Sequence, residues 1–491
     1  MSDQVAEIEE PKLPGNYSAR TNHRWIHAPK ISDKKIPSVE LSNVISTKNK
    51  QEDVDEIHQT LSKFHVSPGQ MYSTESGHMF HAGSICIVLV GLPARGKTNL
   101  AIGLCRYLRW LGVRANLFHF EDYRRDYIGI QADDFLSDQE IEEQRRDLRK
   151  IVIEEMIDFF KIDRGQVAIF DSVNGNSAER ADLAIKMRKH DIRTVFIESL
   201  VDDDELLKSN IKEATKSPDY EGWDENLAIA DYTKKVGKMA KSFESLTRKD
   251  LTWIQSRNLG RSVLVNKLQH DFLTTKIIFY IMNVRLKSGS VYFARCSNNK
   301  LQFKTDPPLN KAGTEYISKM YNALYRHFNL TRSGKGFPQD LEVWTSTRLR
   351  TMQAAAVFKE AGLVVKPRSE LAQLNPGDAE GLSDAELKEK YLSDYERHKL
   401  DPYHHRYPRA ESYHDLALKL EPLILEVGRI DNDVLIIADE TVIRVFYGYL
   451  MASSSSDIPY MRFPSNEIIE ITYNAYINKA KRITIPGVNA D

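Results

Sequence analysis

The chain has little cysteine and no long hydrophobic segment. Its three cysteines, Cys86, Cys105 and Cys296, are widely spaced and form no CxxC pair, which excludes a disulfide framework and a structural zinc site built on cysteine. No apolar run approaches the roughly 20 residues that a membrane-spanning helix needs. We therefore expect a protein that does not insert into a membrane.

An excess of charge of one sign is also missing. The 68 Lys and Arg residues nearly cancel the 69 Asp and Glu residues, so no overall field favours nucleic acid or an anionic membrane as a partner. The first ten residues, MSDQVAEIEE, carry acidic side chains where a signal peptide needs a basic start and an apolar core. We expect a cytoplasmic protein in which any anion site is local.

The length of 491 residues is too great for one compact core, since domains usually hold roughly 100 to 200 residues. Residues 1–80 mix Pro, Ser, Lys, Glu and Asn with few sustained apolar patterns, which indicates a partly disordered N-terminal arm. From residue 85 onward, short apolar runs alternate with longer helical patterns, which predicts an α/β fold with a parallel sheet. The predicted strands are residues 85–90, 115–120, 167–170 and 194–197.

A helix is predicted at residues 138–160, where apolar residues recur at spacings of three, four and seven. Further apolar runs at 291–294 and 434–437 predict strands of a second α/β domain. We therefore expect an N-terminal arm (1–80), a first domain (81–288) and a second domain (289–491).

A phosphate-binding motif, GxxxxGK[ST], follows the first predicted strand and precedes a helical pattern at 99–108. Its glycines let backbone N–H groups close on phosphates, Lys97 can neutralise charge on the β and γ phosphates, and Thr98 can bind Mg²⁺. The alternative, a chance glycine turn before a helix, is disfavoured by the strand–loop–helix setting. We predict an ATP-binding loop that consists of Gly91, Leu92, Pro93, Ala94, Arg95, Gly96, Lys97 and Thr98.

Asp171 follows the strand predicted at 167–170. Proteins with this phosphate-binding loop place a carboxylate at such a strand end, where it holds Mg²⁺ or accepts a hydroxyl proton. Aspartate at the end of a strand also caps loops, so both roles stay open. We predict that Asp171 is catalytic together with Lys97 and binds Mg²⁺ together with Thr98.

Several sequence segments recur in the order found in the 6-phosphofructo-2-kinase/fructose-2,6-bisphosphatase family, and the chain resembles this family over residues 83–486. In the first half the segments are GLPARGKT (91–98), RYLRWLGV (106–113), DYRRD (122–126), VAIFD (167–171) and SPDY (217–220). In the second half they are VWTS (343–346), RYP (406–408) and ESY (411–413).

The resemblance implies a P-loop kinase domain followed by a histidine-phosphatase domain similar to phosphoglycerate mutase. The kinase half would phosphorylate the 2-hydroxyl of fructose 6-phosphate with Mg·ATP, the other half would remove that phosphate, and two chains would form a homodimer through their kinase halves. From the residues alone, two neighbouring arginines are equally typical of a solvated helix start. The positions that match the family are, for ATP and Mg²⁺, Lys97, Thr98, Asp171 and Asn210 and, for the sugar phosphate, Arg124 and Arg125.

Other family positions are changed in the kinase half. The family has arginines where this chain has Leu136 and Ser177, and a threonine where it has Val173. The family's Tyr-Glu-x-x-Tyr element is FESLT at 243–247. Two missing arginines remove roughly 3 to 6 kcal/mol of sugar-phosphate binding. Arg180 is retained, and Lys216 is a candidate substitute for a second catalytic lysine of the family.

The phosphatase half lacks the residues that its family chemistry needs, which are a histidine nucleophile, a second histidine and a glutamic acid. These positions are Cys296, Asp439 and Gln373. Cysteine is itself a nucleophile, but residues 296–302 lack the arginine of a CxxxxxR loop, so a buried structural thiol is favoured. A phosphate-binding pocket without turnover stays open, because three basic residues persist: Arg295, Arg350 and Arg406.

Two further patterns carry no predicted chemistry. Residues 331–336, TRSGKG, lack the full spacing of a phosphate-binding loop and are typical of a surface turn. His404 and His405 are adjacent, and we expect no nearby carboxylate or thiol to complete a metal set, so no zinc site is predicted.

Three functions remain open for the whole chain. The first is an ATP-dependent 6-phosphofructo-2-kinase that keeps an inactive bisphosphatase domain as a scaffold. The second is a kinase with a different sugar-phosphate substrate. The third is a nucleotide-binding regulatory pseudoenzyme, which would pair with an active relative. The complete ATP loop favours the first two, whereas the changed sugar-phosphate positions favour the last two.

Overall fold

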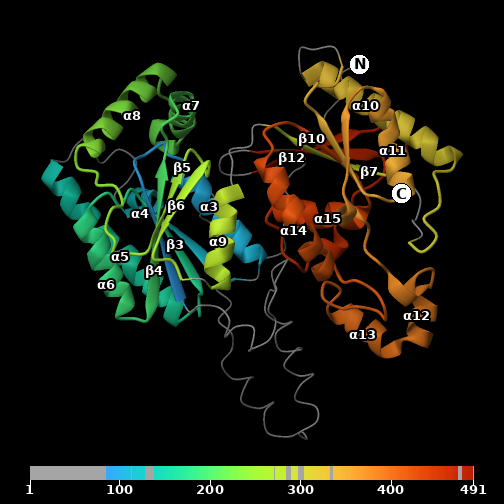
Figure 1. Ribbon diagram of the computed structural model, residues 1–491, viewed down its shortest axis with the longest axis horizontal. Helices are drawn as coiled ribbons and strands as arrows, with labels where there is room; N and C mark the ends of the chain where they lie inside the picture. Colours follow the sequence, from blue (N-terminus) through green and yellow to red (C-terminus); the bar gives the residue numbers. More distant parts are fainter. Residues whose placement is uncertain are drawn as a thin grey trace, which may run out of the picture. The chain divides into compact units, whose positions relative to one another are not determined.

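The computed structural model describes residues 84–111, 113–127, 138–269, 271–283, 289–296, 303–331, 336–473 and 478–489 (Figure 1). They divide into two compact units, the first up to residue 283 and the second from residue 289. The predicted N-terminal arm, Leu136 and most of the turn at 331–336 lie outside the described residues.

The first unit is built on a six-stranded sheet with the strand order β2-β3-β1-β4-β5-β6. All neighbouring strands are parallel except β5 and β6, which are antiparallel. The predicted parallel sheet is confirmed, and the sequence analysis missed β5 and β6. The strands are β1 (Ser84–Val90), β2 (Ala115–His119), β3 (Val167–Asp171), β4 (Ile192–Leu200), β5 (Trp253–Arg257) and β6 (Ser262–Asn266).

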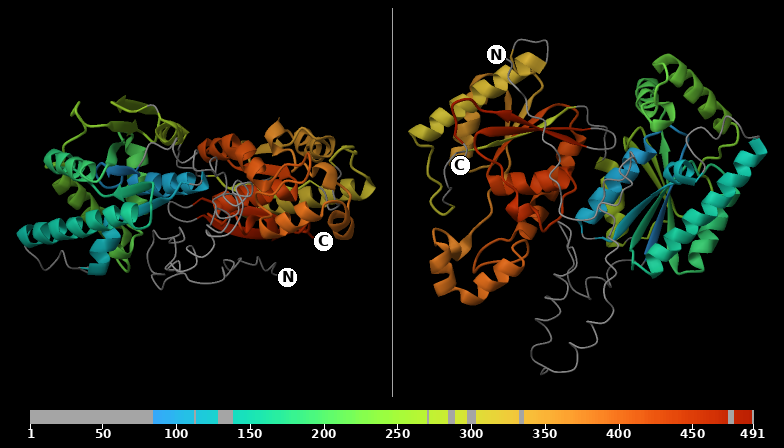
Figure 2. Two further views of the ribbon diagram at one scale, coloured as in Figure 1. Left: turned by 90° about the horizontal axis from the view of Figure 1, so that it is seen from below. Right: turned by 180° about the vertical axis from the view of Figure 1, so that it is seen from behind.

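Helices cover both faces of this sheet (Figures 1 and 2). On one face α5 and α6 pack against Phe118, Phe170 and Phe196 of the sheet. On the other face lie α3 and α9, whose Tyr107 and Tyr280 rings stack with centroids 5.1 Å apart. The helices of this unit are α3 (Lys97–Trp110), α4 (Phe120–Tyr127), α5 (Asp138–Lys161), α6 (Ser177–Arg188), α7 (Asp204–Ala214), η2 (Pro218–Tyr220), α8 (Glu225–Ala240) and α9 (Phe272–Asn283).

The helix predicted at 138–160 is confirmed as α5. The strand predicted at 115–120 is one residue too long, because β2 ends at His119 and Phe120 begins α4. An apolar residue at a helix start extends a hydrophobic run without extending the strand, so periodicity alone cannot separate the two elements.

The second unit contains a second six-stranded sheet, with the order β12-β11-β7-β10-β8-β9. Its central strand β10 (Val434–Ala438) is fully buried and pairs in parallel with β7 (Val291–Arg295) and β8 (Glu342–Thr345), as expected for an uninterrupted apolar run between two layers of helices. The remaining strands are β9 (Val364–Pro367), β11 (Glu467–Thr472) and β12 (Lys479–Thr484).

The helices of the second unit surround this sheet and extend into a small lobe that carries α12 and α13 (Figure 1). No helix among the described residues of either unit is long and apolar enough to cross a membrane. The helices are α10 (Lys311–Thr331), α11 (Leu349–Glu360), η3 (Ser369–Leu371), η4 (Gly377–Ala379), α12 (Asp384–Lys390), α13 (Leu392–Leu400), α14 (Tyr413–Arg429), α15 (Glu440–Leu450) and η5 (Ile458–Tyr460).

Histidines gather where this lobe meets α14. His404 Nδ1 lies 2.9 Å from an Asp401 oxygen, and His405 Nε2 lies 3.3 Å from an Asp394 oxygen. Each histidine thus has a carboxylate beside it, because the turn after α13 folds back onto that helix. Within the described part of the chain, no group of three or more His, Cys, Asp and Glu side chains is arranged to hold a metal ion.

His414 lies against His404, with ring centroids 5.3 Å apart. Its Nδ1 atom is buried without a hydrogen-bond partner. Burial, followed by the field of His404, lowers the pKa of His414 to about 4. The folded state therefore favours the neutral form of this imidazole.

We predict that this histidine makes stability depend on pH. Its contribution is complete above its unfolded pKa of about 6.5 and is lost as the pH falls toward its folded pKa of about 4. From pH 7.5 to pH 5, His414 should account for a loss of about 2 kcal/mol in the free energy of unfolding. Urea unfolding across this pH range should show a flatter pH dependence in His414→Asn than in the wild type. An unchanged slope in His414→Asn would contradict the assignment.

Candidate active site

The predicted phosphate-binding loop joins β1 to α3 at the carboxyl edge of the first sheet. Gly91 has a φ of +141°, and a Cβ atom there would lie 2.8 Å from the Ser199 carbonyl oxygen. Gly96 has a φ of +76° just before α3 begins. Any larger residue at these two positions would strain the turn or collide with β4, so the two glycines of the motif are required by the loop's shape.

Four hydrogen bonds hold the loop in place. Ser199 Oγ donates to the Arg95 carbonyl oxygen (2.6 Å), and Asn210 Nδ2 donates to that of Ala94 (3.1 Å). The other two are Gly91 N to Val173 O (3.1 Å) and Asn174 Nδ2 to Leu89 O (2.7 Å). Asn210, predicted at the nucleotide site, thus supports the loop through the loop's backbone.

Lys97 is buried at the first position of α3, and its Nζ donates to the Leu92 carbonyl oxygen at 2.8 Å. Burial lowers the pKa of Lys97 to about 8, although the nearby Asp171 carboxylate favours the charged form. A buried ammonium with a single neutral acceptor is an incomplete arrangement. A phosphate group that reached this loop would supply the missing negative charge.

Asp171 at the end of β3 is almost fully buried, and its two carboxylate oxygens have different surroundings. Oδ2 lies 2.8 Å from Nδ1 of His119, at the end of β2. Oδ1 is buried and has no hydrogen-bond partner. The Thr98 hydroxyl interacts with the same carboxyl group. A carboxylate oxygen without a partner and a hydroxyl therefore lie together beside the loop, and both are oxygen ligands of the kind that Mg²⁺ prefers.

The charges of Asp171 and His119 stabilise each other. Burial opposes the charge on Asp171, but His119, Lys97 and Thr98 outweigh it and lower the pKa of the carboxyl group. Burial likewise opposes the charge on His119, but Asp171 outweighs it and raises the pKa of the imidazole. A carboxylate with a lowered pKa accepts protons poorly and keeps its charge, so the geometry suits a metal ligand better than a general base.

The sequence analysis missed His119. In the sheet, His119 and Asp171 are direct neighbours in the parallel register of β2 and β3. A sequence signal exists, because both polar residues end apolar strands, and the carboxyl ends of parallel strands meet at one edge. Without the strand order, however, nothing in the sequence pairs them.

Arg124 and Arg125 lie on α4 beside this edge and share one partner. The two oxygens of Asp219, in η2, accept from Arg124 Nη2 at 2.7 Å and from Arg125 Nη1 at 3.0 Å. Arg124 also pairs with Glu121 (2.6 Å) and Arg125 with Asp122 (2.8 Å). The structure brings the two predicted sugar-phosphate arginines together, and carboxylates hold both of them.

The two altered segments of the first unit pack against each other. A Cβ atom on Gly175 would lie 3.0 Å from the Phe243 ring, and Glu244 N donates to the Gly175 carbonyl oxygen at 2.9 Å. Buried Arg180 bridges the segments, donating to the carbonyl oxygens of Asn174 (2.9 Å) and Ser245 (3.5 Å). The altered segments 171–177 and 243–247 therefore form one structural unit, and Arg180 hydrogen-bonds to the backbone of both segments.

Lys216, the candidate substitute lysine, is exposed and pairs with Glu213. It lines a cavity of ≈ 320 Å³ between α7, η2 and α8, together with Tyr220 and Trp223. Asp219, which holds the two arginines, is the neighbour of Tyr220 in η2. Lys216 is therefore close to the arginine pair in the fold, but its present partner is a glutamate.

In the second unit each replaced phosphatase position is bonded to another part of the fold. Cys296 is buried, its N–H donates to the Ala438 carbonyl oxygen at 3.0 Å, and burial, followed by the Asp439 charge, raises the pKa of its thiol to about 12. The Asp439 carboxylate caps α15 and accepts from Thr441 N at 2.9 Å. Gln373 accepts a hydrogen bond from buried Arg350.

These contacts give each replaced residue a structural partner. The negative charge of Asp439 acts on both Cys296 and Arg350. A phosphate bound there would need positive charge instead. Arg295 Nη1 donates to the Phe463 carbonyl oxygen at 3.3 Å. Arg406 is more than half exposed and pairs with Asp415, so no contact among the described residues brings it into this group.

Comparisons with known proteins match both units. Residues 72–288 match the family model of 6-phosphofructo-2-kinase, and residues 294–485 match that of the histidine phosphatase superfamily, branch 1. A Saccharomyces cerevisiae protein named provisionally as a 6-phosphofructo-2-kinase/fructose-2,6-bisphosphatase is 36% identical over 503 residues, which cover 98% of this chain and 96% of that protein.

Two further relatives align over most of their own length. The fructose-2,6-bisphosphatase of the same yeast is 32% identical over 82% of this chain and 90% of its own. Human 6-phosphofructo-2-kinase/fructose-2,6-bisphosphatase 4 is 32% identical over 81% of this chain and 84% of its own. With both units matched in order and along nearly the full chain, this protein belongs to the 6-phosphofructo-2-kinase/fructose-2,6-bisphosphatase family.

Proposed function

We propose that the protein is an ATP-dependent sugar-phosphate kinase that converts fructose 6-phosphate to fructose 2,6-bisphosphate, and that its second unit has no bisphosphatase activity. One observation carries the kinase proposal. Beside a complete phosphate-binding loop, the Oδ1 atom of Asp171 is buried without a partner while His119 holds Oδ2. A buried charged oxygen without a partner is costly, and a bound cation would remove that cost.

Each residue of the nucleotide site has a distinct task in this proposal. Backbone N–H groups of the loop and the N-terminus of α3 bind the phosphates, and Lys97 moves from the Leu92 carbonyl oxygen to a phosphate oxygen. Thr98 and Asp171 would hold Mg²⁺, which neutralises charge on the β and γ phosphates. His119 fixes the orientation of the Asp171 carboxylate.

Positioning supplies most of the expected rate enhancement. In phosphoryl transfer the transition state is loose, so an aligned acceptor hydroxyl matters more than a strong base. A carboxylate kept ionised by His119 is compatible with this requirement. Arg124 and Arg125 would position the sugar by binding its phosphate group. Each arginine would exchange one carboxylate oxygen of Asp219 for a phosphate oxygen.

This exchange limits the affinity for the sugar phosphate. Contacts to the sugar phosphate must replace the ion pairs with Asp219. Only the difference in free energy between an arginine–phosphate bond and an arginine–Asp219 bond therefore contributes to binding. The family arginines at positions 136 and 177 are missing as well. We therefore expect an enzyme with a weak affinity for fructose 6-phosphate.

A second candidate function is a nucleotide-binding regulatory pseudoenzyme that associates with an active relative. It is favoured by the same arginine pair, because Asp219 holds both guanidinium groups in a closed arrangement. In that case ATP would bind, but no phosphoryl group would be transferred to fructose 6-phosphate.

A homodimer through the kinase halves completes the proposal. Strand β6 is the edge of the first sheet in the described structure, and its Leu264 and Val265 are 56% and 45% exposed. Nearby α9 exposes Phe279 and Met282. Unprotected apolar edge strands pair readily with other chains, so this edge supports self-association.

We predict that Lys97→Ala weakens ATP binding roughly 10- to 100-fold, because it removes one charge-assisted contact worth about 1.5 to 3 kcal/mol. Titration calorimetry with Mg·ATP measures this. Lys189→Ala, which removes an exposed cation at the end of α6, is the control and should bind as the wild type does. No ATP binding by the wild type, or equal affinity in Lys97→Ala, would contradict the site.

We predict weak formation of fructose 2,6-bisphosphate by the wild type. The substitutions Leu136→Arg and Ser177→Arg should each raise kcat/KM roughly tenfold or more, mainly through a lower KM for fructose 6-phosphate. Ser318→Arg on α10 adds the same charge in the second unit and should have no effect. If the wild type binds ATP but makes no product at saturating fructose 6-phosphate, the pseudoenzyme becomes the leading account.

We predict no release of phosphate from fructose 2,6-bisphosphate, since loss of a nucleophile costs on the order of 10⁴ to 10⁶ in rate.

With a pKa of about 12, the Cys296 thiol should also resist iodoacetamide at neutral pH in the folded protein and react in urea. Peptide mass spectrometry measures the alkylation. Phosphate release that disappears in Cys296→Ser would show instead that the thiol is a working nucleophile.

We predict that the protein is a dimer in light scattering and that Leu264→Lys shifts it toward the monomer, because a charge would have to be buried at the β6 edge. Leu330→Lys places the same charge on an 81% exposed leucine of α10 and is the matched control. A wild-type monomer, or a Leu264→Lys dimer of unchanged stability, would exclude this interface.

A further inference from the structure

The turn between β5 and β6 carries a buried leucine that lies against the phosphate-binding loop. Leu259 is only 9% exposed, and its Cδ2 atom lies 3.1 Å from the position that a Cβ atom on Gly96 would take. Hairpin turns usually lie on the surface and consist of small or polar residues. An apolar side chain that is buried at such a place therefore packs on another part of the fold, and here that part is the loop.

The backbone of this turn is unusual for a leucine. Asn258, Leu259 and Gly260 have φ angles of +48°, +55° and +81°. Glycine and asparagine adopt this left-handed region readily, whereas the side chain of a leucine crowds its own backbone there. Within the described part of the chain, Leu259 is the one large apolar residue in this region. Such strain persists where other contacts compensate for it, and it is common at functional sites.

Polar contacts fix the turn to the end of β4. The N–H of Asn258 donates to the Leu200 carbonyl oxygen at 2.8 Å, and its Oδ1 atom accepts from the Asp202 N–H at 2.9 Å. Arg257, the last residue of β5, pairs with the Asp202 carboxylate. These contacts hold the backbone of the turn beside the loop, so the strained conformation is maintained from outside the turn as well.

We propose that Leu259 is a positioning residue for the phosphate-binding loop. Its side chain packs on Gly96 and keeps the loop in the conformation that receives the phosphate groups of ATP. This role rests on the proposed nucleotide site, and it assigns part of the affinity for ATP to a turn that is more than 150 residues away in the sequence.

Leu259 extends a set of contacts to three consecutive residues of the loop. Asn210 binds the carbonyl oxygen of Ala94, and Ser199 binds that of Arg95. At the next residue, Gly96, the nearest side-chain atom from elsewhere in the described chain is Cδ2 of Leu259. The loop is therefore held from α7, from β4 and from the β5–β6 turn.

The contact at Gly96 matters because this residue has the greatest conformational freedom. Gly96 is the last residue before α3, and glycine populates more of φ/ψ space than any other residue. A loop that is held in its binding conformation loses less entropy when a ligand arrives, so its affinity is higher. Since Leu259 would act on the loop and not on the ligand, its loss should affect every ligand that presents a triphosphate.

Titration calorimetry of the full chain tests this role with two probes, Mg·ATP and Mg·tripolyphosphate, of which the second has no base or sugar. We expect Leu259→Ala to weaken the binding of both probes by a similar factor, roughly fivefold or more. Leu259→Met keeps an apolar side chain of similar volume and should bind both probes within about twofold of the wild type.

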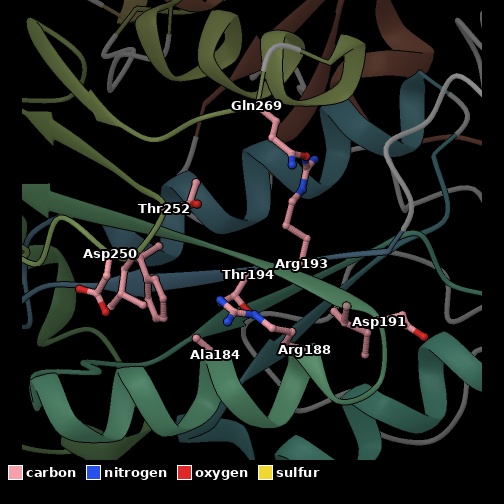
Figure 3. Close-up of a pocket in the computed structure, with 11 residues that line it drawn as sticks. Ala184, Arg188, Asp191, Arg193, Thr194, Asp250, Thr252 and Gln269 are labelled. Atoms are coloured by element: carbon pink, nitrogen blue, oxygen red, sulfur yellow. The ribbon is translucent and has the colours of Figure 1, made fainter.

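Two further variants separate affinity from stability. Leu251→Ala removes a leucine that is just as buried (7% exposed), but at the opposite edge of the sheet, in the lining of the cavity at the amino end of β4 (Figure 3). It should lower the temperature of unfolding and leave the affinity for both probes unchanged. Leu259→Gly relieves the backbone strain, so it should unfold at a higher temperature than Leu259→Ala and still bind both probes weakly.

Equal affinity of Leu259→Ala and the wild type for both probes would overturn the positioning role and leave the proposed nucleotide site intact. A loss confined to Mg·ATP would also overturn it, because the side chain would then contact the rest of the nucleotide. The same holds if Leu259→Gly binds as the wild type does, or if the wild type binds Mg·ATP but no tripolyphosphate. A wild type that binds neither probe would exclude the nucleotide site together with this role.

Discussion

The proposed kinase site depends on the pairing of β2 with β3, because this register places His119 beside Asp171 at the carboxyl edge of the sheet. The ion pair between them decides the protonation of the carboxylate and leaves one of its oxygens for another partner. Burial makes each charge costly in isolation, and each residue offsets part of that cost for the other. The loop, Lys97 and Thr98 are arranged around this fixed carboxylate, as strand ends are in other sheets that bind nucleotides.

The phosphate-binding loop of this site was predictable from sequence, whereas the contacts between residues that are remote in sequence were not. A glycine-rich loop between a strand and a helix is a contiguous pattern, so residues 91–98 could be placed between β1 and α3. His119, Asp219 and Phe243 act through residues that are remote in sequence, and their contacts depend on strand order and on how helices pack. The same limit applies to the fold. Buried parallel strands were found from their apolar runs, but β6 has no buried residue and gives a weak signal.

In the second unit, the positions at which the resemblance places phosphatase residues are bonded into the fold. Asp439 caps α15 and Gln373 binds Arg350. The Thr441 hydroxyl connects the two segments, donating to Asp439 and accepting from Leu374 N at 3.2 Å. The Asp439 carboxylate, which acts on Cys296 and Arg350, balances charge that a bound phosphate would otherwise balance.

The contact of Gly175 with the Phe243 ring also bears on how the two altered segments respond to engineering. A Cβ atom at position 175 would lie 3.0 Å from the ring, so the ring must shift slightly before any larger residue fits there. Residues in such contact do not contribute independently, and the effects of substitutions at positions 175 and 243 should therefore not add. Redesign of one segment has to include the other.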